Sequence, residues 1–290
     1  MTHRILPFLL FVLTLLPLAP AHAQNRAAPA EGPLAPRTVT YKDGDTVLEG
    51  YWVPSQCTEE KGAMAPVVLV VHQWRGLSEN EKLRADMLSE LCYNAFAIDM
   101  YGVGVRPKNN EEAAKESGKF KDNPELALRR MNAALDFVNK QMNVDTTRIA
   151  AIGYCFGGGL VLDLARSGAP LKGVISFHGN LSPRVKISEP GAIKASIQVH
   201  HGALDPHVPQ LEVQAFIQEM TDAKADWSLT EYADAVHAFT QMGAGDDPST
   251  GVAYNQKADY RSWEAAVNFL DEVMAPDGVM DAPAMPAAKP

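Results

Sequence analysis

The chain has 290 residues, of which 46% are hydrophobic and 21% are charged, and its formal net charge at pH 7 is −9. This is the composition of an ordinary globular protein, and the length suits one α/β domain with a sizeable core. A mildly acidic chain without a basic run argues against nucleic-acid binding.

The first 23 residues have the pattern of a secretory signal peptide. An apolar, proline-interrupted run over 5–18 follows Arg4, and Ala21 and Ala23 are small residues at the two positions that a signal peptidase reads. We therefore expect cleavage after Ala23 and export of the mature protein, to the periplasm of a Gram-negative bacterium or to the medium. The run is short for a membrane span, so no stable insertion is expected after cleavage, and an uncleaved anchor is the alternative.

Residues 24–36 and 275–290 are rich in Ala and Pro and are expected to be a disordered leader and a disordered tail. Between them, residues 37–274 are predicted to form an α/β-hydrolase domain that begins with an antiparallel hairpin over 38–53. Apolar strands are then predicted over 66–72, 95–99, 148–152, 172–177, 193–200 and 227–232. Helices are predicted over 78–92, 111–117, 209–221 and 257–274, with another that begins at Asn123. This alternation indicates a mostly parallel central sheet with helices on both faces.

Helical spacing also predicts which side chains face the core. In the helix over 78–92 they are Leu83, Met87, Leu88 and Leu91. In the closing helix they are Trp263, Val267 and Leu270.

The rest of the chain is organised around residues 149–160. A strand-forming run leads into Gly153, Cys155 follows two positions later, and Gly157 completes a G-x-C-x-G pattern before an apolar helical run. This is the form of a nucleophile elbow, in which a strand turns sharply into a helix. Side chains at the two glycines would collide across the turn. The pattern predicts that Cys155 is a nucleophile whose thiolate is stabilised by the helix N-terminus, although a buried structural cysteine is the alternative for this motif alone.

Two further residues follow predicted strands and complete a triad. Asp205 comes after the strand over 193–200, and His237 comes after the strand over 227–232. Because the carboxyl ends of parallel strands share one edge of the sheet, we expect both side chains near Cys155. The order nucleophile, acid, histidine is that of the α/β-hydrolases. His237 would move the proton and Asp205 would orient the imidazole, whereas each residue alone is more often an ordinary turn or surface residue.

An oxyanion formed during acyl transfer needs backbone donors. The N–H of Phe156, directly after the nucleophile, and that of Trp74, in the loop after the strand over 66–72, are predicted to supply them. No cofactor is expected. Four further histidines show no H-E-x-x-H or comparable spacing, so no metal is expected either; these are His72, His200, His201 and His207.

The chain has three cysteines, Cys57, Cys92 and Cys155. In an oxidising compartment an odd count indicates one disulfide and one free reactive thiol, and Cys155 is the odd one out. Cys57 and Cys92 are then the candidates for a disulfide, although their distance in space does not follow from the sequence.

Over residues 39–270 the chain resembles the dienelactone hydrolases, which are α/β-hydrolases with a Cys-His-Asp triad. The most specific similarity is G-Y-C-F-G-G around Cys155, which matches the family's G-Y-C-x-G-G. Supporting motifs are V-V-H-Q-W ending at Trp74, D-M-Y-G beginning at Asp99, G-A-L-D ending at Asp205 and H-A-F beginning at His237. The resemblance implies hydrolysis of a lactone or ester through an acyl-thioester on the cysteine.

Two positions depart from that family. Gln73 stands where the resemblance implies a glutamate that contacts the resting thiol, and Gln241 stands where it implies an arginine that holds a substrate carboxylate. Arg75 and Arg106 lie in loops that could border the pocket, but solvated surface arginines fit them better. The family's fold and triad therefore carry over better than its substrate.

The neutral side chain of Gln73 has a consequence for the nucleophile. It removes the repulsion that a carboxylate would exert on a thiolate, and its amide could donate a hydrogen bond to the sulfur. Cys155 is therefore predicted to rest as a thiolate paired with His237.

We predict a single-domain hydrolase of a small-molecule ester or lactone. A thioesterase or amide hydrolase that uses the same triad is one alternative. A catalytically weakened hydrolase fold that binds a ligand or partner is another, which Gln73 favours and the intact triad opposes.

Overall fold

The computed structural model describes residues 35–57 and 64–276. The expected signal peptide over 1–23 lies outside these ranges, as does most of the expected leader and tail. Among the described residues, no helix is both long and apolar enough to cross a bilayer.

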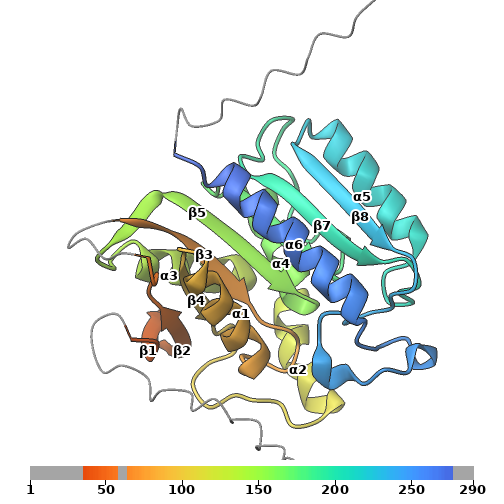
Figure 1. Cartoon of the computed structure of the whole chain (residues 1–290), viewed down its shortest axis with the longest axis horizontal. Helices are drawn as coiled ribbons and strands as arrows, with labels where there is room; N and C mark the ends of the chain where they lie inside the picture. Colours follow the sequence, from red (N-terminus) through yellow and green to blue (C-terminus); the bar gives the residue numbers. More distant parts are fainter. Residues whose placement is uncertain (1–34, 58–63, 277–290) are drawn as a thin grey trace, which may run out of the picture.

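The strands in the described part of the chain form one sheet in the order β1-β2-β4-β3-β5-β6-β7-β8 (Figure 1). The pairs β1–β2 and β2–β4 are antiparallel, and all other pairs are parallel. The strands are β1 (Arg37–Asp43), β2 (Thr46–Val53), β3 (Ala65–Val71), β4 (Asn94–Ile98), β5 (Val144–Tyr154), β6 (Gly173–Phe177), β7 (Ser196–Gly202) and β8 (Trp227–Tyr232). The prediction of a mostly parallel sheet with an N-terminal hairpin is confirmed.

Helices cover both faces of this sheet (Figure 1). Residues of α1 (Glu79–Glu90) and α6 (Gln256–Val273) share one apolar core with Val68 and Val70 of β3. Leu69 of the same strand belongs to a second core. That core also takes residues from α2 (Asn110–Lys121), α3 (Pro124–Val138), α4 (Phe156–Arg166) and α5 (Gln210–Asp222). Because successive side chains of a strand point to opposite faces, a continuous apolar run such as β3 serves both cores.

The predicted apolar face of α1 is confirmed only in part, because Leu83 and Met87 are half-buried. Leu88 is buried, but Leu91 lies beyond the helix end and is 39% exposed. The helix instead buries Glu81, which completes a capping box with Ser78, and Arg84. Hydrophobic periodicity misses such positions because a charged side chain is buried where a polar partner meets it, which for Glu81 is the nearby Ser78 and for Arg84 is a residue far away in the chain.

The partner of Arg84 comes from α6. Its guanidinium lies 2.5 Å from the carboxylate of Asp259 and 5.0 Å from the ring centroid of Trp263. Trp263 is half-buried, as is Val267, while Leu270 is buried as predicted. The buried ion pair and the stacked ring therefore join the two helices on this face of the sheet.

A disulfide joins Cys57, after β2, to Cys92, after α1. The pairing that the cysteine count left open is thus formed in the structure. Cys155 remains as the free thiol.

Candidate active site

Cys155 occupies the sharp turn between β5 and α4. Its backbone dihedrals are φ 53° and ψ −114°, which a residue with a Cβ atom adopts only under strain. The turn is held from both sides, because the Cys155 N–H donates to the carbonyl of Phe177 at 2.9 Å and the Gly159 N–H donates to the Cys155 carbonyl at 3.3 Å. The sulfur therefore lies at the N-terminus of α4, where the helix dipole favours a thiolate.

Gly153 and Gly157 bring β5, α4 and β3 into backbone contact. A Cβ atom on Gly153 would lie 2.2 Å from the carbonyl oxygen of Gly157, and one on Gly157 would lie 2.3 Å from the carbonyl oxygen of Val71. The neighbours are backbone atoms, which cannot rotate away as a side chain would. Neither position can carry a side chain unless the strand and helix move apart.

One chain of hydrogen bonds connects Cys155, His237 and Asp205. His237 Nε2 lies 3.1 Å from the Cys155 sulfur, and Nδ1 lies 2.8 Å from Asp205 Oδ2. Asp205 is buried, and its Oδ1 accepts the N–H of His207 at 2.8 Å. Because an ionised carboxylate can only accept hydrogen bonds, Nδ1 of His237 carries a proton in this arrangement.

Cys155 and His237 stabilise one another's charged forms. Burial would raise the pKa of the Cys155 thiol, but His237 and the N–H groups of Phe156 and Trp74 outweigh it and lower this pKa. Burial would lower the pKa of His237, but the Cys155 thiolate and Asp205 raise it to about 10. These shifts favour a thiolate beside an imidazolium.

Two backbone N–H groups are directed at the Cys155 sulfur and lower its pKa, those of Phe156 and Trp74. Phe156 is the first residue of α4, and Trp74 lies in the loop after β3. The two segments meet because β3 pairs with β5 in the sheet. An anionic oxygen on an acyl group attached to the sulfur would lie near the same donors.

Comparison with known proteins identifies the family. A model described as the dienelactone hydrolase family matches residues 54–274. The chain belongs to the dienelactone hydrolase family. Its resemblance to that family is thus confirmed, and with it the α/β-hydrolase fold and a hydrolase function.

Several known proteins are similar to this chain along most of their own length. A solved structure described as a dienelactone hydrolase-like promiscuous phosphotriesterase from metagenomic libraries is 36% identical, with a TM-score of 0.76 over 82% of this chain and 98% of that chain. A predicted carboxymethylenebutenolidase of Saccharolobus solfataricus is 31% identical over 240 residues, which cover 71% of this chain and 89% of the relative. An uncharacterized protein of Caenorhabditis elegans is 38% identical over 147 residues, or 50% of this chain and 93% of the relative.

This dienelactone hydrolase family member has a neutral pair of side chains where the sequence departs from the family pattern. The amide nitrogen of Gln73 donates to the side-chain oxygen of Gln241. The amide of Gln73 thus has Gln241 as a partner, and the backbone N–H groups of Phe156 and Trp74 lower the pKa of Cys155. Neither amide carries charge at any ordinary pH.

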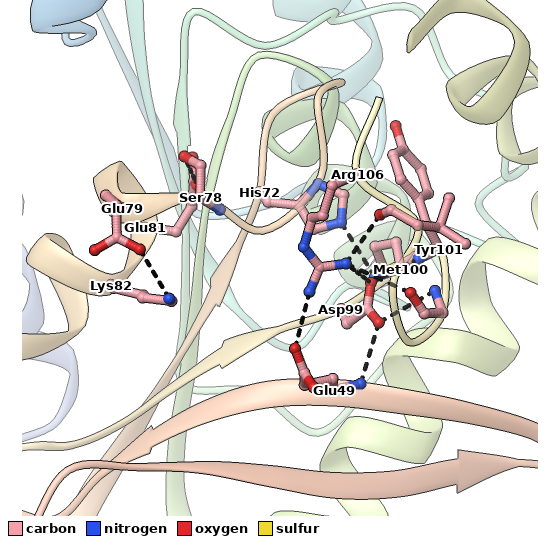
Figure 2. Close-up of polar contacts among 12 residues, drawn as sticks. Glu49, His72, Ser78, Glu79, Glu81, Lys82, Asp99, Met100, Tyr101 and Arg106 are labelled. Carbon is pink, nitrogen blue, oxygen red and sulfur yellow. Dashed lines mark hydrogen bonds and ion pairs between the residues drawn. The ribbon is translucent and has the colours of Figure 1, made fainter. Parts of the chain in front are cut away.

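Two arginines near the loop after β3 already have partners. Arg75 donates to the side chain of Asn110 at 2.5 Å. Arg106 lies 3.5 Å from a carboxylate oxygen of Glu49 and 3.7 Å from one of Asp99, as Figure 2 shows. Their guanidinium groups are thus engaged by the protein itself.

One histidine beside the triad has no signal in the sequence. His178, directly after β6, has φ 40°, and its ring centroid lies 5.4 Å from that of His237. Its Nε2 lies 2.8 Å from the hydroxyl of Thr240. Burial and the charge of His237 hold the pKa of His178 well below its ordinary value, so it packs against the triad as a neutral ring. Only the sheet order, which puts β6 beside β5, brings it there.

The described part of the chain contains no cluster of side chains that could form a metal site. Within residues 35–57 and 64–276, no three His, Cys, Asp or Glu side chains are close enough to share an ion. His200, for example, pairs instead with Gln198 and with the hydroxyl of Tyr232, both at 3.0 Å.

Proposed function

We propose that the protein hydrolyses a carboxylic ester or lactone through an acyl-thioester on Cys155. The observation that carries this proposal is the hydrogen-bonded chain from Asp205 through His237 to the sulfur, with two backbone donors at that sulfur. A thiolate in this setting can attack a carbonyl carbon, and the negative charge that develops on oxygen is stabilised by groups already in place.

Acylation begins with attack of the Cys155 thiolate on the carbonyl carbon, which forms a C–S bond and moves an electron pair onto oxygen. The N–H groups of Phe156 and Trp74 bind this oxyanion. When the carbonyl re-forms, the C–O bond to the leaving alcohol breaks, and His237 Nε2 gives its proton to the departing oxygen. In a lactone, the freed alcohol stays attached to the acyl group.

Deacylation repeats these roles with water. His237, now neutral, takes a proton from water at Nε2 while the water oxygen attacks the thioester carbon. The C–S bond then breaks, and the sulfur leaves as a thiolate beside the imidazolium. The products are a carboxylic acid and an alcohol, and Asp205 keeps the imidazole in one orientation throughout.

The substrate is proposed to be uncharged beside its reacting bond. Gln73 and Gln241 form a neutral pair, and the position from which the family's arginine would hold a carboxylate has no cation. An amide pair neither attracts a carboxylate nor repels an apolar acyl group strongly. A neutral ester should therefore be preferred to an ester that carries a carboxylate at the same position.

A neutral phosphotriester is the second candidate substrate. The relative at 36% identity is described as a promiscuous phosphotriesterase. A phosphotriester has no charge to pair with an arginine, which agrees with the neutral Gln73–Gln241 pair. Attack of the thiolate on phosphorus would place charge on an oxygen that the same two N–H groups could bind.

We also propose that the protein is exported. The signal-peptide pattern over residues 1–23 supports this, and so does the disulfide between Cys57 and Cys92, because such bonds persist in oxidising compartments. N-terminal sequencing of the secreted or periplasmic protein should begin near Gln24. Intact Met1 on a solely cytoplasmic product would contradict export.

The test of the proposed activity is mass spectrometry of purified protein mixed with a panel of p-nitrophenyl acetate, a thioester, an anilide and a neutral phosphotriester. We expect an acyl adduct on Cys155 and release of p-nitrophenol, and a Cys155→Ala variant should show neither. Turnover of the thioester or anilide alone would favour those alternatives. An adduct that accumulates only on other residues, or an active Cys155→Ala variant, would remove Cys155 from the mechanism.

A further inference from the structure

His72, the residue after β3, is fully buried, and both of its ring nitrogens have partners. Nδ1 lies 2.5 Å from the carbonyl oxygen of Gln73, and Nε2 lies 3.1 Å from the backbone nitrogen of Met100. Figure 2 shows the ring beside the turn that follows β4. The proposed chemistry of the triad makes no use of this side chain.

The two partners of His72 settle the position of its proton. The Met100 N–H can only donate, so Nε2 of His72 must be the accepting nitrogen. Nδ1 then carries the hydrogen and donates to the Gln73 carbonyl, which can only accept. Burial also lowers the pKa of His72, which agrees with a neutral ring that has one tautomer.

The carbonyl that His72 binds belongs to the same peptide group as the N–H of Trp74. A peptide group is planar, and its C=O and N–H point in opposite directions. A donor to the Gln73 oxygen therefore also helps to fix the direction of the Trp74 N–H, which is directed at the Cys155 sulfur. The same hydrogen bond polarises the peptide group and makes its N–H a stronger donor.

We infer that His72 is a positioning residue for the oxyanion hole, which it serves through the peptide group between Gln73 and Trp74. The inference rests on the proposed acyl transfer at Cys155 and assigns His72 a task that none of the triad residues performs. The ring does not touch the substrate; it holds the donor that does.

The turn after β4 holds this part of the loop at a second point. The carboxylate of Asp99, which is fully buried, accepts the N–H groups of Tyr101 at 3.0 Å and of Gly102 at 3.1 Å. The hydroxyl of Tyr101 donates to the carbonyl oxygen of Trp74 at 2.8 Å. The carbonyl of Gln73 is thus bound by His72 and by the N–H of Gly76, the latter at 3.1 Å, and the carbonyl of Trp74 is bound by Tyr101. Both side chains are tied to one turn.

Two substitutions separate the two hydrogen bonds of His72. In His72→Asn the side-chain amide lies near the place of Nδ1, so the donor to Gln73 is kept and the acceptor for Met100 is lost. In His72→Gln the amide lies near the place of Nε2, so the acceptor is kept and the donor is lost. Both variants remove one bond and the ring, which makes each the control for the other.

The measurement compares two reactions of Cys155, taken at the pH plateau of each variant. Acylation by p-nitrophenyl acetate develops an oxyanion, whereas alkylation by iodoacetamide is a displacement at carbon that does not. We expect His72→Gln to lower the acylation rate by about tenfold, the equivalent of one net hydrogen bond, because the Trp74 N–H is kept but is held less firmly. Alkylation should change by less than about threefold, and His72→Asn should keep most of the acylation rate.

Several outcomes would overturn the inference. Equal acylation rates for wild type and His72→Gln would do so, and so would equal losses of acylation and alkylation, which indicate general damage. If the wild-type protein is not acylated at all, it is the proposed function that fails. Nitrogen-15 NMR of wild-type histidines needs no variant: a His72 ring that carries its proton on Nε2, or that titrates between pH 5 and pH 9, contradicts the assigned hydrogen bonds.

Discussion

Two segments direct an N–H group at the Cys155 sulfur, and they are held in different ways. The elbow from β5 to α4 is fixed by backbone contacts, since no side chain caps α4 and Cβ atoms at Gly153 and Gly157 would strike carbonyl oxygens. The loop after β3 relies on side chains as well as on a backbone turn. His72 and Tyr101 donate to its carbonyls at Gln73 and Trp74, and the Gly76 N–H donates to the Gln73 carbonyl at 3.1 Å.

The difference teaches where each segment is vulnerable. An elbow that depends on the absence of side chains is damaged by adding one, and the damage reaches the strands that pack against it. A loop that depends on single hydrogen bonds can lose one of them while the sheet stays intact. Changes in the elbow should therefore appear as lost stability, whereas changes in the loop should appear as lost kcat.

Removal of the triad histidine should give the largest loss of kcat, with which the effects of changes in both segments can be compared. His237→Ala removes the group that moves the proton, and we expect kcat for an ester to fall by about 10⁴-fold or more. Asp205→Asn should cost a similar or smaller factor, because the imidazole loses its orientation. The double variant should be little worse than His237→Ala alone. Additive losses in steady-state kinetics would show that the two residues act independently.

Gly157→Ala tests the elbow. The added Cβ atom would lie 2.3 Å from the Val71 carbonyl oxygen, so the free energy of unfolding should fall. We expect a loss on the order of 3 kcal/mol in urea titrations. The matched control is Gly118→Ala in α2, where the new atom has no neighbour within 4 Å, and there stability should rise by about 0.5–1 kcal/mol. Wild-type stability in Gly157→Ala would mean that backbone packing does not hold the elbow.

Tyr101→Phe tests the loop. It removes the hydroxyl that donates to the Trp74 carbonyl at 2.8 Å, and kcat should fall by about tenfold, the equivalent of one net hydrogen bond. Tyr154→Phe is the control, because that buried hydroxyl has no hydrogen-bond partner in the structure. It should leave kcat unchanged and raise stability by about 1 kcal/mol. Equal losses of kcat in both variants would contradict a specific role for Tyr101.

Gln73→Glu tests how a negative charge in the loop after β3 affects the pKa of Cys155. The pKa of Cys155 is lowered in this protein, so its alkylation rate should fall only as the pH drops through a value below that of an ordinary thiol. A carboxylate at position 73 disfavours the thiolate and should raise the pKa by about one unit at most, so the rate falls at a higher pH and peroxide reacts more slowly.

The matched control for this change is the double variant Gln73→Glu/Gln241→Arg. Because the two side chains are in contact, an arginine at 241 should pair with the new carboxylate and return the profile toward that of wild type. Alkylation profiles of all three proteins that coincide would show that position 73 does not set the charge state of Cys155.

The features that the sequence predicts well depend on residues close together in the chain. The glycines and cysteine of the elbow fall within five positions, and the apolar runs of β3 and β5 predict strands buried on both faces. The positions of Cys155, Asp205 and His237 also predict that the three side chains meet, because each residue follows the end of a strand at one edge of the sheet.

The sequence by itself therefore determined the fold class, the elbow and the identity of the three hydrogen-bonded residues. Only the tertiary structure decided the partners of the loop after β3, since His72 meets Met100 and Tyr101 meets Trp74 across the ends of β3 and β4. The contact of Gln73 with Gln241 and the burial of Arg84 were decided in the same way. The physical reason is that a local pattern records which side chains are apolar or small, whereas a polar side chain finds its partner only after the strands have taken their order in the sheet.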